Sequence, residues 1–239
     1  MGDLFIRKAT IDWSEIAQGS YLRGIDAVSR LEELSFKNPV TVFAGDNGTG
    51  KSTLLEAIAV AAGFNPEGGT RNYSFSTYDD VSELDRAMSL VRGFRRIRVG
   101  SYLRAESFFN VASAAMNEYN FDGQMEDWHA ESHGESFLSF LTKYREPGLF
   151  LMDEPEAALS PKRQVALARH VVDQAERGSQ FVIATHSPIL LAIPGAQVLS
   201  FDGGVVHECR YWETGAYKVM RAFMDDPDAV LAGEVGLEG

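Results

Sequence analysis

Apolar positions along the chain fall into short runs separated by stretches with helical spacing. Strand-like runs cover Leu4–Ile11, Leu31–Phe36 and Val40–Ala44, with polar turns between them, which predicts an antiparallel lead-in to a central strand. From Lys51 onward the apolar residues recur every three or four positions as far as Gly63, which predicts a helix that ends at this glycine.

Two later runs, Gly148–Met152 and Phe181–Thr185, are apolar at almost every position, as is typical of strands buried on both faces. Between them, a helix is predicted to begin at Ser160-Pro161 and to end at Gly178. The pattern also predicts helices at Val81–Gly93, Glu106–Tyr119, Gly134–Tyr144 and Tyr217–Met224, a strand at Ile97–Leu103, a hairpin of Val198–Phe201 with Val205–Glu208, and an ordered loop at Phe64–Asp80.

Strands that alternate with helices favour an α/β fold in which helices cover a mostly parallel sheet on both sides. We predict a single domain over residues 1–239, with antiparallel N-terminal strands and a helical subdomain at about residues 106–147. The length of 239 residues and the apolar content of 45% suit one large core.

The net charge and the cysteine content limit which partners and which cellular compartment are expected for the protein. The formal net charge of −12 disfavours nucleic acid and anionic membranes as partners unless a local basic patch overrides it. The single Cys209, the charged start of the chain and the lack of an apolar run of about eighteen residues predict a cytoplasmic protein without an integral membrane segment. Residues that could form a basic patch, or simply a solvated strand face, are Arg92, Arg95, Arg96, Arg98 and Arg104.

The pattern G-x-x-x-x-G-K-S lies between a predicted strand and a predicted helix. Its glycines permit the positive φ angles with which backbone N–H groups surround phosphate oxygens, and the helix adds its positive end. Lys51, expected to be exposed on this loop, would reach the β- and γ-phosphates of ATP, and the Ser52 hydroxyl would bind Mg²⁺. The alternative is a glycine-rich turn without a ligand. The predicted nucleotide-binding residues are Gly45, Asp46, Asn47, Gly48, Thr49, Gly50, Lys51, Ser52 and Thr53.

Two adjacent carboxylates, Asp153 and Glu154, follow the first of the buried runs. Because parallel strands end at one edge of a sheet, we expect both acids near the glycine-rich loop. Asp153 would hold Mg²⁺ directly or through water, and Glu154 would orient and deprotonate the attacking water. Without that loop, two acids after a strand would indicate only a surface turn.

His186 follows the second buried run, so the same edge of the sheet is expected to carry it. It would donate a hydrogen bond towards the γ-phosphate and the attacking water, and so sense which nucleotide is bound. A lone histidine is more often structural, and Ser187-Pro188 behind it could merely begin a helix.

Ser132, His133, Gly134 and Glu135 stand at the start of a predicted helix and have two compatible readings. Ser132 with Glu135 makes a capping box, which needs no function. A helix N-terminus with a glycine also lets the phosphate of another molecule approach closely. His129 lies four residues before His133, but the helix begins after Ser132, which argues against a metal pair.

The order of these motifs resembles the ATP-binding-cassette (ABC) superfamily of ATPases over nearly the whole chain: a glycine-rich loop, then Ser-His-Gly-Glu, Asp-Glu-Pro and Thr-His-Ser-Pro. More narrowly, Gly-Asp-Asn-Gly-Thr-Gly-Lys-Ser-Thr-Leu-Leu-Glu-Ala-Ile-Ala, Leu-Arg-Ala-Glu-Ser-Phe-Phe-Asn and Asp-Glu-Pro-Glu-Ala-Ala-Leu-Ser-Pro resemble small stand-alone bacterial ATPases of the AAA_21 and AAA_23 kind. The resemblance implies an ABC-type P-loop fold and an ATP-dependent homodimer. In that dimer, residues 45–53 of one subunit face residues 132–135 of the other across a bound Mg-ATP.

Several positions depart from the superfamily's pattern. Its Leu-Ser-Gly-Gly-Gln signature becomes Ser132-His-Gly-Glu-Ser, so only Ser132 and Gly134 carry over directly. Glu106, directly after a predicted strand, replaces the glutamine that usually reaches Mg²⁺. The loop after the catalytic acid reads Ala157-Ala-Leu-Ser160 instead of ending in aspartate, and Tyr21 is a weak candidate for stacking on adenine.

The sequence therefore predicts a Mg²⁺-dependent ATPase that hydrolyses ATP to ADP and phosphate in a homodimer, coupled to an unidentified protein or nucleic-acid partner. One alternative is the ATP-binding subunit of a membrane ABC transporter, against which the altered signature stands. Another is an ATP-binding switch with little turnover, against which Asp153, Glu154 and His186 stand. A chromosome-clamp or break-repair ATPase would need a long coiled coil between the glycine-rich loop and the signature, where no heptads occur. A P-loop kinase would have no use for the Ser-His-Gly-Glu cap.

Overall fold

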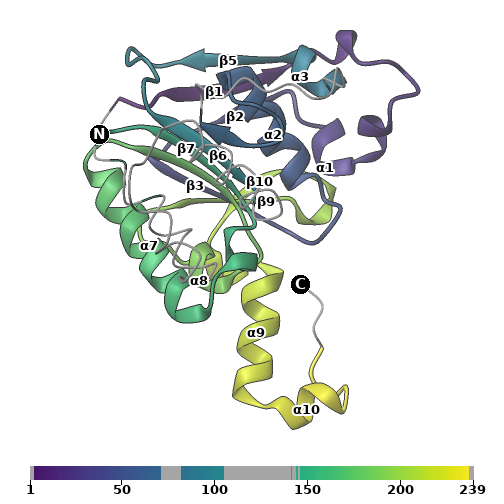
Figure 1. The fold of residues 1–239 in the computed structure, drawn as a ribbon. Helices are drawn as coiled ribbons and strands as arrows, with labels where there is room; N and C mark the ends of the chain where they lie inside the picture. Colours follow the sequence, from purple (N-terminus) through teal and green to yellow (C-terminus); the bar gives the residue numbers. More distant parts are fainter. Residues whose placement is uncertain (1–2, 71–81, 105–140, 142–143, 145, 237–239) are drawn as a thin grey trace.

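The computed structural model describes residues 3–70, 82–104, 141, 144 and 146–236. Its strands form two sheets, one with seven strands in the order β10-β9-β3-β8-β7-β6-β4 and one with three in the order β2-β1-β5. Helix α2 lies between the two sheets, and α7 with α8 covers the other face of the large sheet (Figure 1). This confirms an α/β fold with helices on both faces of a mostly parallel sheet.

Five neighbouring strands of the large sheet run parallel, and a short antiparallel strand closes each edge. The parallel strands are β9 (Gln197–Ser200), β3 (Val40–Ala44), β8 (Gln180–Ala184), β7 (Leu149–Asp153) and β6 (Gly100–Arg104), and the edge strands are β10 (His207–Cys209) and β4 (Gly69–Thr70). Their register pairs Phe43 with Ala184 and Asp153 with both Ala184 and Arg104, so the carboxyl ends of β3, β8, β7 and β6 lie along one edge.

Alternation along the buried strands divides the core into two apolar clusters, one on each face of the large sheet. In β8, Val182 packs in the cluster that contains α2 (Lys51–Ala62), whereas Ile183 packs in the cluster that contains α7 (Pro161–Glu176). Because successive strand residues point to opposite faces, a run that is apolar throughout serves both clusters. This is the physical reason for the continuous apolar runs in the sequence.

The small antiparallel sheet packs on the outer side of α2. It contains β1 (Ile6–Ile11), β2 (Glu33–Ser35) and β5 (Met88–Arg92), and β1 pairs with both neighbours. The remaining elements are η1 (Trp13–Glu15), η2 (Tyr21–Gly24), α1 (Asp26–Ser29), α3 (Glu83–Ala87), η3 (Pro155–Ala158), α8 (Pro188–Leu191), η4 (Asp202–Gly204), η5 (Tyr211–Glu213), α9 (Gly215–Asp225) and α10 (Pro227–Leu231).

The predicted helix at Val81–Gly93 is wrong in its second half. Helix α3 ends at Ala87, and β5 follows at once, paired antiparallel with β1. The Met88-Ser-Leu-Val-Arg stretch offers apolar residues that suit either period, and the exposed backbone edge of β1 decides in favour of a strand. The strand predicted at Ile97–Leu103 begins later, at Gly100, and α10 was not predicted.

Most of the predicted helical subdomain, with the helix at Glu106–Tyr119 and nearly all of that at Gly134–Tyr144, lies outside the described residues. Within the described part of the chain, no helix is both long enough and apolar enough to cross a membrane.

Candidate active site

The glycine-rich loop (Gly45–Gly50) joins the end of β3 to the start of α2, as predicted. Gly48 and Gly50 have φ angles of 80° and 96°, a region that residues with a side chain seldom adopt. A Cβ atom on Gly50 would lie 2.5 Å from Val28 Cγ2 and 2.7 Å from Ile25 Cγ2, so this glycine also lets α1 pack directly on the loop.

Lys51 is not exposed as expected, since only 4% of its surface is accessible. Its ammonium group donates hydrogen bonds to the backbone oxygens of Gly45, at 2.7 Å, and Asp46, at 2.8 Å. Burial lowers the pKa of Lys51, and the negative charges of Glu154, Asp202, Asp153 and Asp46 oppose that shift. The backbone oxygens at the start of the loop therefore surround the ammonium group of Lys51.

Ser52 and Asp153 meet at the edge of the sheet, although 101 positions separate them in the chain. The Ser52 hydroxyl donates a 2.8 Å hydrogen bond to Asp153 Oδ1. Burial raises the pKa of Asp153, while the bond from Ser52 and the charge of Arg104 lower it. A hydroxyl and a carboxylate side by side are hard oxygen donors of the kind that suits Mg²⁺. In the described part of the chain, this site included, no group of three or more His, Cys, Asp or Glu side chains is arranged to hold a metal ion.

Glu154 has an unusual backbone conformation directly after β7. Its φ of 48° is the one positive value for a non-glycine residue among the described residues. Its backbone N–H donates to Ala184 O at 2.9 Å, which ties the turn to the end of β8. Strained residues of this kind concentrate at functional sites.

His186 stands beside Glu154 at this edge, with its Nε2 atom 3.5 Å from Glu154 Oε1. Nε2 is buried and makes no hydrogen bond to any described residue. The backbone N–H of His186 donates to Glu156 Oε1 at 2.6 Å, and that of Ser187 donates to the same oxygen at 3.2 Å. The structure therefore brings Ser52, Asp153, Glu154 and His186 together, as the strand-end reasoning predicted.

Two residues at the site were not predicted from the sequence. Glu156, in η3, fixes the backbone of His186. Asp202, two residues after the end of β9, accepts a 2.9 Å hydrogen bond from the backbone N–H of Asp46 in the glycine-rich loop. Asp202 had a detectable signal, because an acid that follows a parallel strand is expected at the same edge of the sheet.

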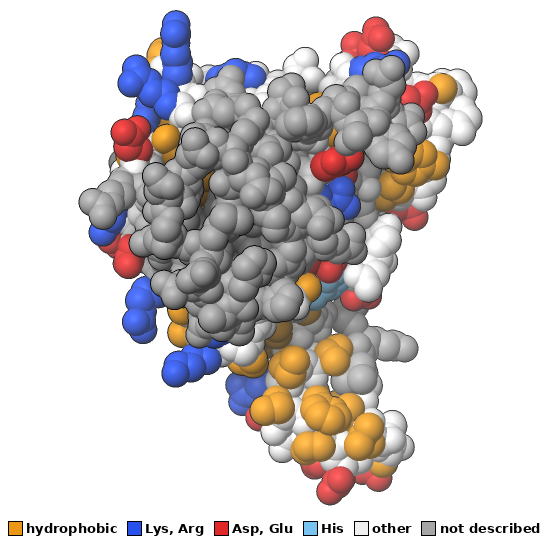
Figure 2. Space-filling view, viewed as in Figure 1, with side chains coloured by type: hydrophobic (Ala, Val, Ile, Leu, Met, Phe, Trp, Pro, Cys, Tyr) orange, Lys and Arg blue, Asp and Glu red, His pale blue; other side chains and the backbone are white. Residues whose placement is uncertain are grey.

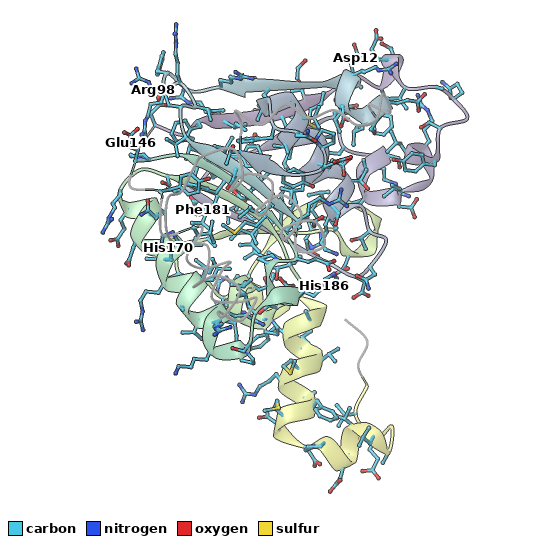
Figure 3. The ribbon with its side chains drawn as sticks, viewed as in Figure 1. Asp12, Arg98, Glu146, His170, Phe181 and His186 are labelled. Carbon is cyan, nitrogen blue, oxygen red and sulfur yellow. The ribbon has the colours of Figure 1, made fainter. Side chains whose placement is uncertain are left out.

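The five arginines suggested for a basic patch have different surroundings in the structure. Arg104 donates to Glu56 at 2.9 Å and lies 4.0 Å from Asp153, so it belongs to the site. Arg92 and Arg95 donate to backbone oxygens of Ala61 and Gly178. Arg98 lies at the opposite end of the large sheet from His186 (Figure 3).

The glycine-rich loop opens onto a cleft of about 1450 Å³. Its walls include residues 46–49 of the loop, His186, residues 202–204, residues 24–27 and one side of α9. Tyr21, the candidate for adenine stacking, is exposed and does not line this cleft.

The predicted metal ligand Glu106 and the predicted signature residues Ser132, His133, Gly134 and Glu135 lie outside the described residues. Their roles stay predictions.

Two family models match parts of the chain. The one described as "AAA domain, putative AbiEii toxin, Type IV TA system" matches residues 127–192, and the one described as "AAA domain" matches residues 20–97. The second range contains the glycine-rich loop, and the first contains Asp153, Glu154 and His186.

Known proteins of the ABC type are similar to most of the chain. The "Putative ABC transporter ATP-binding protein" of Methanocaldococcus jannaschii is 26% identical over 193 residues, which cover 70% of this chain and 68% of the relative. The solved structure of cbiO1 from Clostridium perfringens, part of the ABC transporter complex cbiONQ, aligns with a TM-score of 0.51 and 16% identity. That alignment covers 97% of this chain and 100% of cbiO1, and it concerns the fold.

One AAA-domain match contains the glycine-rich loop, and the other contains the acids and the histidine that lie beside it at the edge of the sheet. The similarity to ATP-binding cassettes extends over most of the chain. The chain is therefore similar to ATPases of the ABC superfamily.

Proposed function

We propose that this protein binds Mg-ATP at residues 45–53 and hydrolyses it to ADP and phosphate between two copies of the chain. The observation that carries the proposal is the 2.8 Å contact of Ser52 with Asp153, with Glu154 and His186 on the same edge of the sheet. Each of these side chains has a distinct part in phosphate transfer to water.

Phosphate binding rests on the glycine-rich loop and the start of α2. Backbone N–H groups of the loop and the positive end of the helix attract phosphate oxygens. Lys51 would exchange its contacts with Gly45 O and Asp46 O for oxygens of the β- and γ-phosphates. The lysine is thus held within the loop before any ligand arrives, which limits the ordering cost of binding.

Ser52 and Asp153 would hold Mg²⁺, with Glu106 as a further predicted ligand. When bound, the ion neutralises charge on the phosphate oxygens. Mg²⁺ commonly takes one or two protein ligands and completes its shell with phosphates and water. The Ser52–Asp153 pair fits that requirement.

Glu154 would accept a proton from the attacking water. The backbone of Glu154 is fixed by its positive φ angle and by the hydrogen bond from its N–H to Ala184 O, and this sets the position from which its side chain extends. His186, whose backbone is held by Glu156, would use Nε2 to donate a hydrogen bond to the γ-phosphate. The second copy would supply residues 132–135 over the same phosphate.

A second candidate is the ATP-binding subunit of a membrane transporter. It is favoured by the similarity to the M. jannaschii protein and to cbiO1, whose descriptions both refer to ABC transporters. In that case the same ATPase chemistry would serve a membrane partner. A pull-down from solubilised membranes of the host distinguishes the two candidate functions, because a transporter subunit should capture a membrane protein and a stand-alone ATPase should not.

Phosphate release from ATP tests the proposed activity. We expect slow but measurable turnover by the wild type and a loss of about 10²–10⁴-fold in Glu154→Gln, because this change removes the general base. Glu176→Gln, an exposed change of the same type on α7, should match the wild type. If wild-type turnover does not exceed that of Lys51→Ala, even at high protein concentration, the protein is a binding switch.

A further inference from the structure

Two turns at the edge of the large sheet lie beyond the paired part of their strands. The register of β7 with β8 ends at Asp153 and Ala184, and the bond from Glu154 N–H to Ala184 O continues it by one residue. Past this point the turn after β8 is joined to the turn after β7 by side chains. The position of His186 relative to Glu154 therefore depends on those side chains.

Glu156 makes the first of these contacts. Its Oε1 atom accepts the backbone N–H of His186 at 2.6 Å and that of Ser187 at 3.2 Å. Hydrogen bonds to an ionised carboxylate are short and about twice as strong as those between neutral groups. The Oε2 atom of Glu156 is buried and has no hydrogen-bond partner among the described residues, so this carboxyl group lies inside the turn.

Gln164, near the start of α7, makes the second contact. Its Oε1 atom accepts the hydroxyl of Ser187 at 2.6 Å, and its Nε2 atom donates to Leu159 O at 3.0 Å. Leu159 directly follows η3, so the amide joins the end of one turn to the residue after His186 in the other. We call Glu156 and Gln164 the turn clamp.

Capping of α8 does not account for the turn clamp. Ser187 caps this helix with its own hydroxyl, which accepts the N–H groups of Ile189 at 3.2 Å and Leu190 at 3.4 Å. The N–H groups that Glu156 binds belong to residues before the first residue of α8. Glu156 therefore fixes the backbone from which the His186 side chain extends.

The side chains of His186 and Glu154 extend from the two clamped turns and remain accessible. The accessible fraction is 32% for His186 and 45% for Glu154, and their atoms Nε2 and Oε1 are 3.5 Å apart. His186 lies above the start of the projecting helix α9 (Figure 3). At the same place in the space-filling view, a histidine surface is visible beside acidic side chains (Figure 2). A ligand can thus reach both groups while the turn clamp holds the backbone behind them.

We propose that Glu156 and Gln164 are positioning residues, which hold His186 at a fixed distance from Glu154. The inference rests on the proposed function, in which His186 donates to the γ-phosphate and Glu154 accepts a proton from water. Neither clamp residue would touch the nucleotide, since both act through the backbone and the hydroxyl of the turn at residues 186–187. Placement matters here because an error of about 1 Å can cost about 10²-fold in rate.

Amide hydrogen exchange, followed by NMR, tests the turn clamp without nucleotide. The N–H groups of His186 and Ser187 should exchange more than about tenfold faster in Glu156→Ala than in the wild type. Glu156→Gln keeps an acceptor oxygen without the charge, so its rates should lie between the two. Glu176→Ala removes an exposed carboxylate from α7 and should match the wild type. Exchange in Glu156→Ala that equals this control overturns the proposal, and if Glu156→Ala does not fold, Glu156→Gln is compared with the control in the same way.

The preference for ATP over ADP tests what the turn clamp does for the ligand. All proteins carry Glu154→Gln, so that ATP is not consumed. A bond from His186 to the γ-phosphate exists only with ATP, so His186→Ala should lower the ratio of the two affinities about tenfold in calorimetry. Glu156→Ala and Gln164→Ala should each lower this ratio, and neither should lower it further in the His186→Ala background, because both act through His186.

The two measurements separate failure of the inference from failure of the proposed function. Losses that add in the double variants overturn the positioning role of Glu156 and Gln164. A protein that carries only Glu154→Gln and binds ATP no better than ADP contradicts the proposed contact of His186 with the γ-phosphate. The exchange rates of His186 and Ser187 then decide by themselves whether the turn clamp exists.

Discussion

Among single residues, Asp202 shows how a distant side chain shapes the phosphate-binding loop. Its carboxylate accepts the N–H of Asp46, but its negative charge also faces the region where phosphates would bind. Asp202→Asn keeps an acceptor oxygen without the charge, whereas Asp202→Ala removes both. Because both variants are neutral, their difference isolates the hydrogen bond. We expect Asp202→Ala to bind ATP about 2–10-fold more weakly than Asp202→Asn, as measured by calorimetry.

The order of the two neutral variants decides the role of Asp202. Equal ATP affinities of Asp202→Asn and Asp202→Ala would mean that the contact with Asp46 does not position the loop. The wild type is expected to bind more weakly than Asp202→Asn, since the carboxylate repels phosphate. Urea unfolding of each variant checks that the fold is intact.

Residue identities at the site were predictable, but their surroundings were not. The motif from Gly45 to Ser52 and the two strand ends with Asp153 and His186 follow from local sequence, because parallel strands share one edge. The burial of Lys51 and the anchoring by Asp202 depend on how the loop closes on residues far away in the chain. A motif fixes which groups are available, and tertiary packing fixes what they touch.

At the scale of elements, the glycine-rich loop contains two glycines with similar φ angles and different surroundings. No atom lies within 4 Å of a Cβ built on Gly48, whereas one on Gly50 would overlap Val28 and Ile25. Gly48→Ala should cost about 1–2 kcal/mol, from the positive φ alone. Gly50→Ala should cost about 1–3 kcal/mol more, because α1 must move away from the loop. Urea unfolding without nucleotide gives both values, and equal losses would contradict packing of α1 on Gly50.

The start of helix α3 links a capping box to pH. Asp85 accepts the N–H of Ser82 at 3.1 Å, while its other oxygen is buried without a hydrogen bond. Burial, and then the charge of Glu56, raise the pKa of Asp85 to about 6. Because the folded-state pKa exceeds the unfolded value of 3.8, ionisation of Asp85 lowers the free energy of unfolding. This loss of stability is absent below about pH 4, grows between about pH 4 and 6, and is constant above about pH 6.

We therefore expect Asp85→Asn to become more stable relative to the wild type as the pH rises. The amide still accepts the N–H of Ser82 but cannot ionise. The difference in unfolding free energy should increase by about 1 kcal/mol between about pH 5 and pH 7.5. Urea midpoints at the two pH values measure it, and a difference independent of pH would show that Asp85 titrates normally.

Elements were predictable where a local rule and the tertiary contacts agreed. The strand, loop and helix from Val40 to Ala62 formed as predicted. In this stretch the spacing of apolar residues changes from a strand pattern to a helix pattern at the glycines, and the tertiary contacts favour the same elements. Strand β5 was predicted as helix, because its pairing with β1, about eighty positions earlier, outweighs the local pattern. Long-range backbone pairing of this kind leaves no signature within a short window of sequence.

At the scale of the whole molecule, the net charge of −12 opposes self-association of the nucleotide-free protein. We expect it to be mainly monomeric or loosely paired. Bound ATP would add contacts between the glycine-rich loop of one copy and residues 132–135 of the other, and hydrolysis would remove them, so association should follow the nucleotide. Sedimentation velocity of Glu154→Gln, with and without Mg-ATP, should show a dimer only with nucleotide.

Gly134 decides whether the predicted signature makes that contact. In the Glu154→Gln background, Gly134→Asp would place a carboxylate where the partner's phosphate must approach, so the ATP-dependent dimer should be lost while each monomer still binds ATP through Lys51. Gly19→Asp adds the same charge at an open position, with no atom within 4 Å of the new Cβ, and should leave the dimer intact. If Gly134→Asp still dimerises as the control does, residues 132–136 are only a helix cap. If neither protein responds to ATP, the sandwich mechanism itself is wrong, and the strand-edge site must act within one copy of the chain.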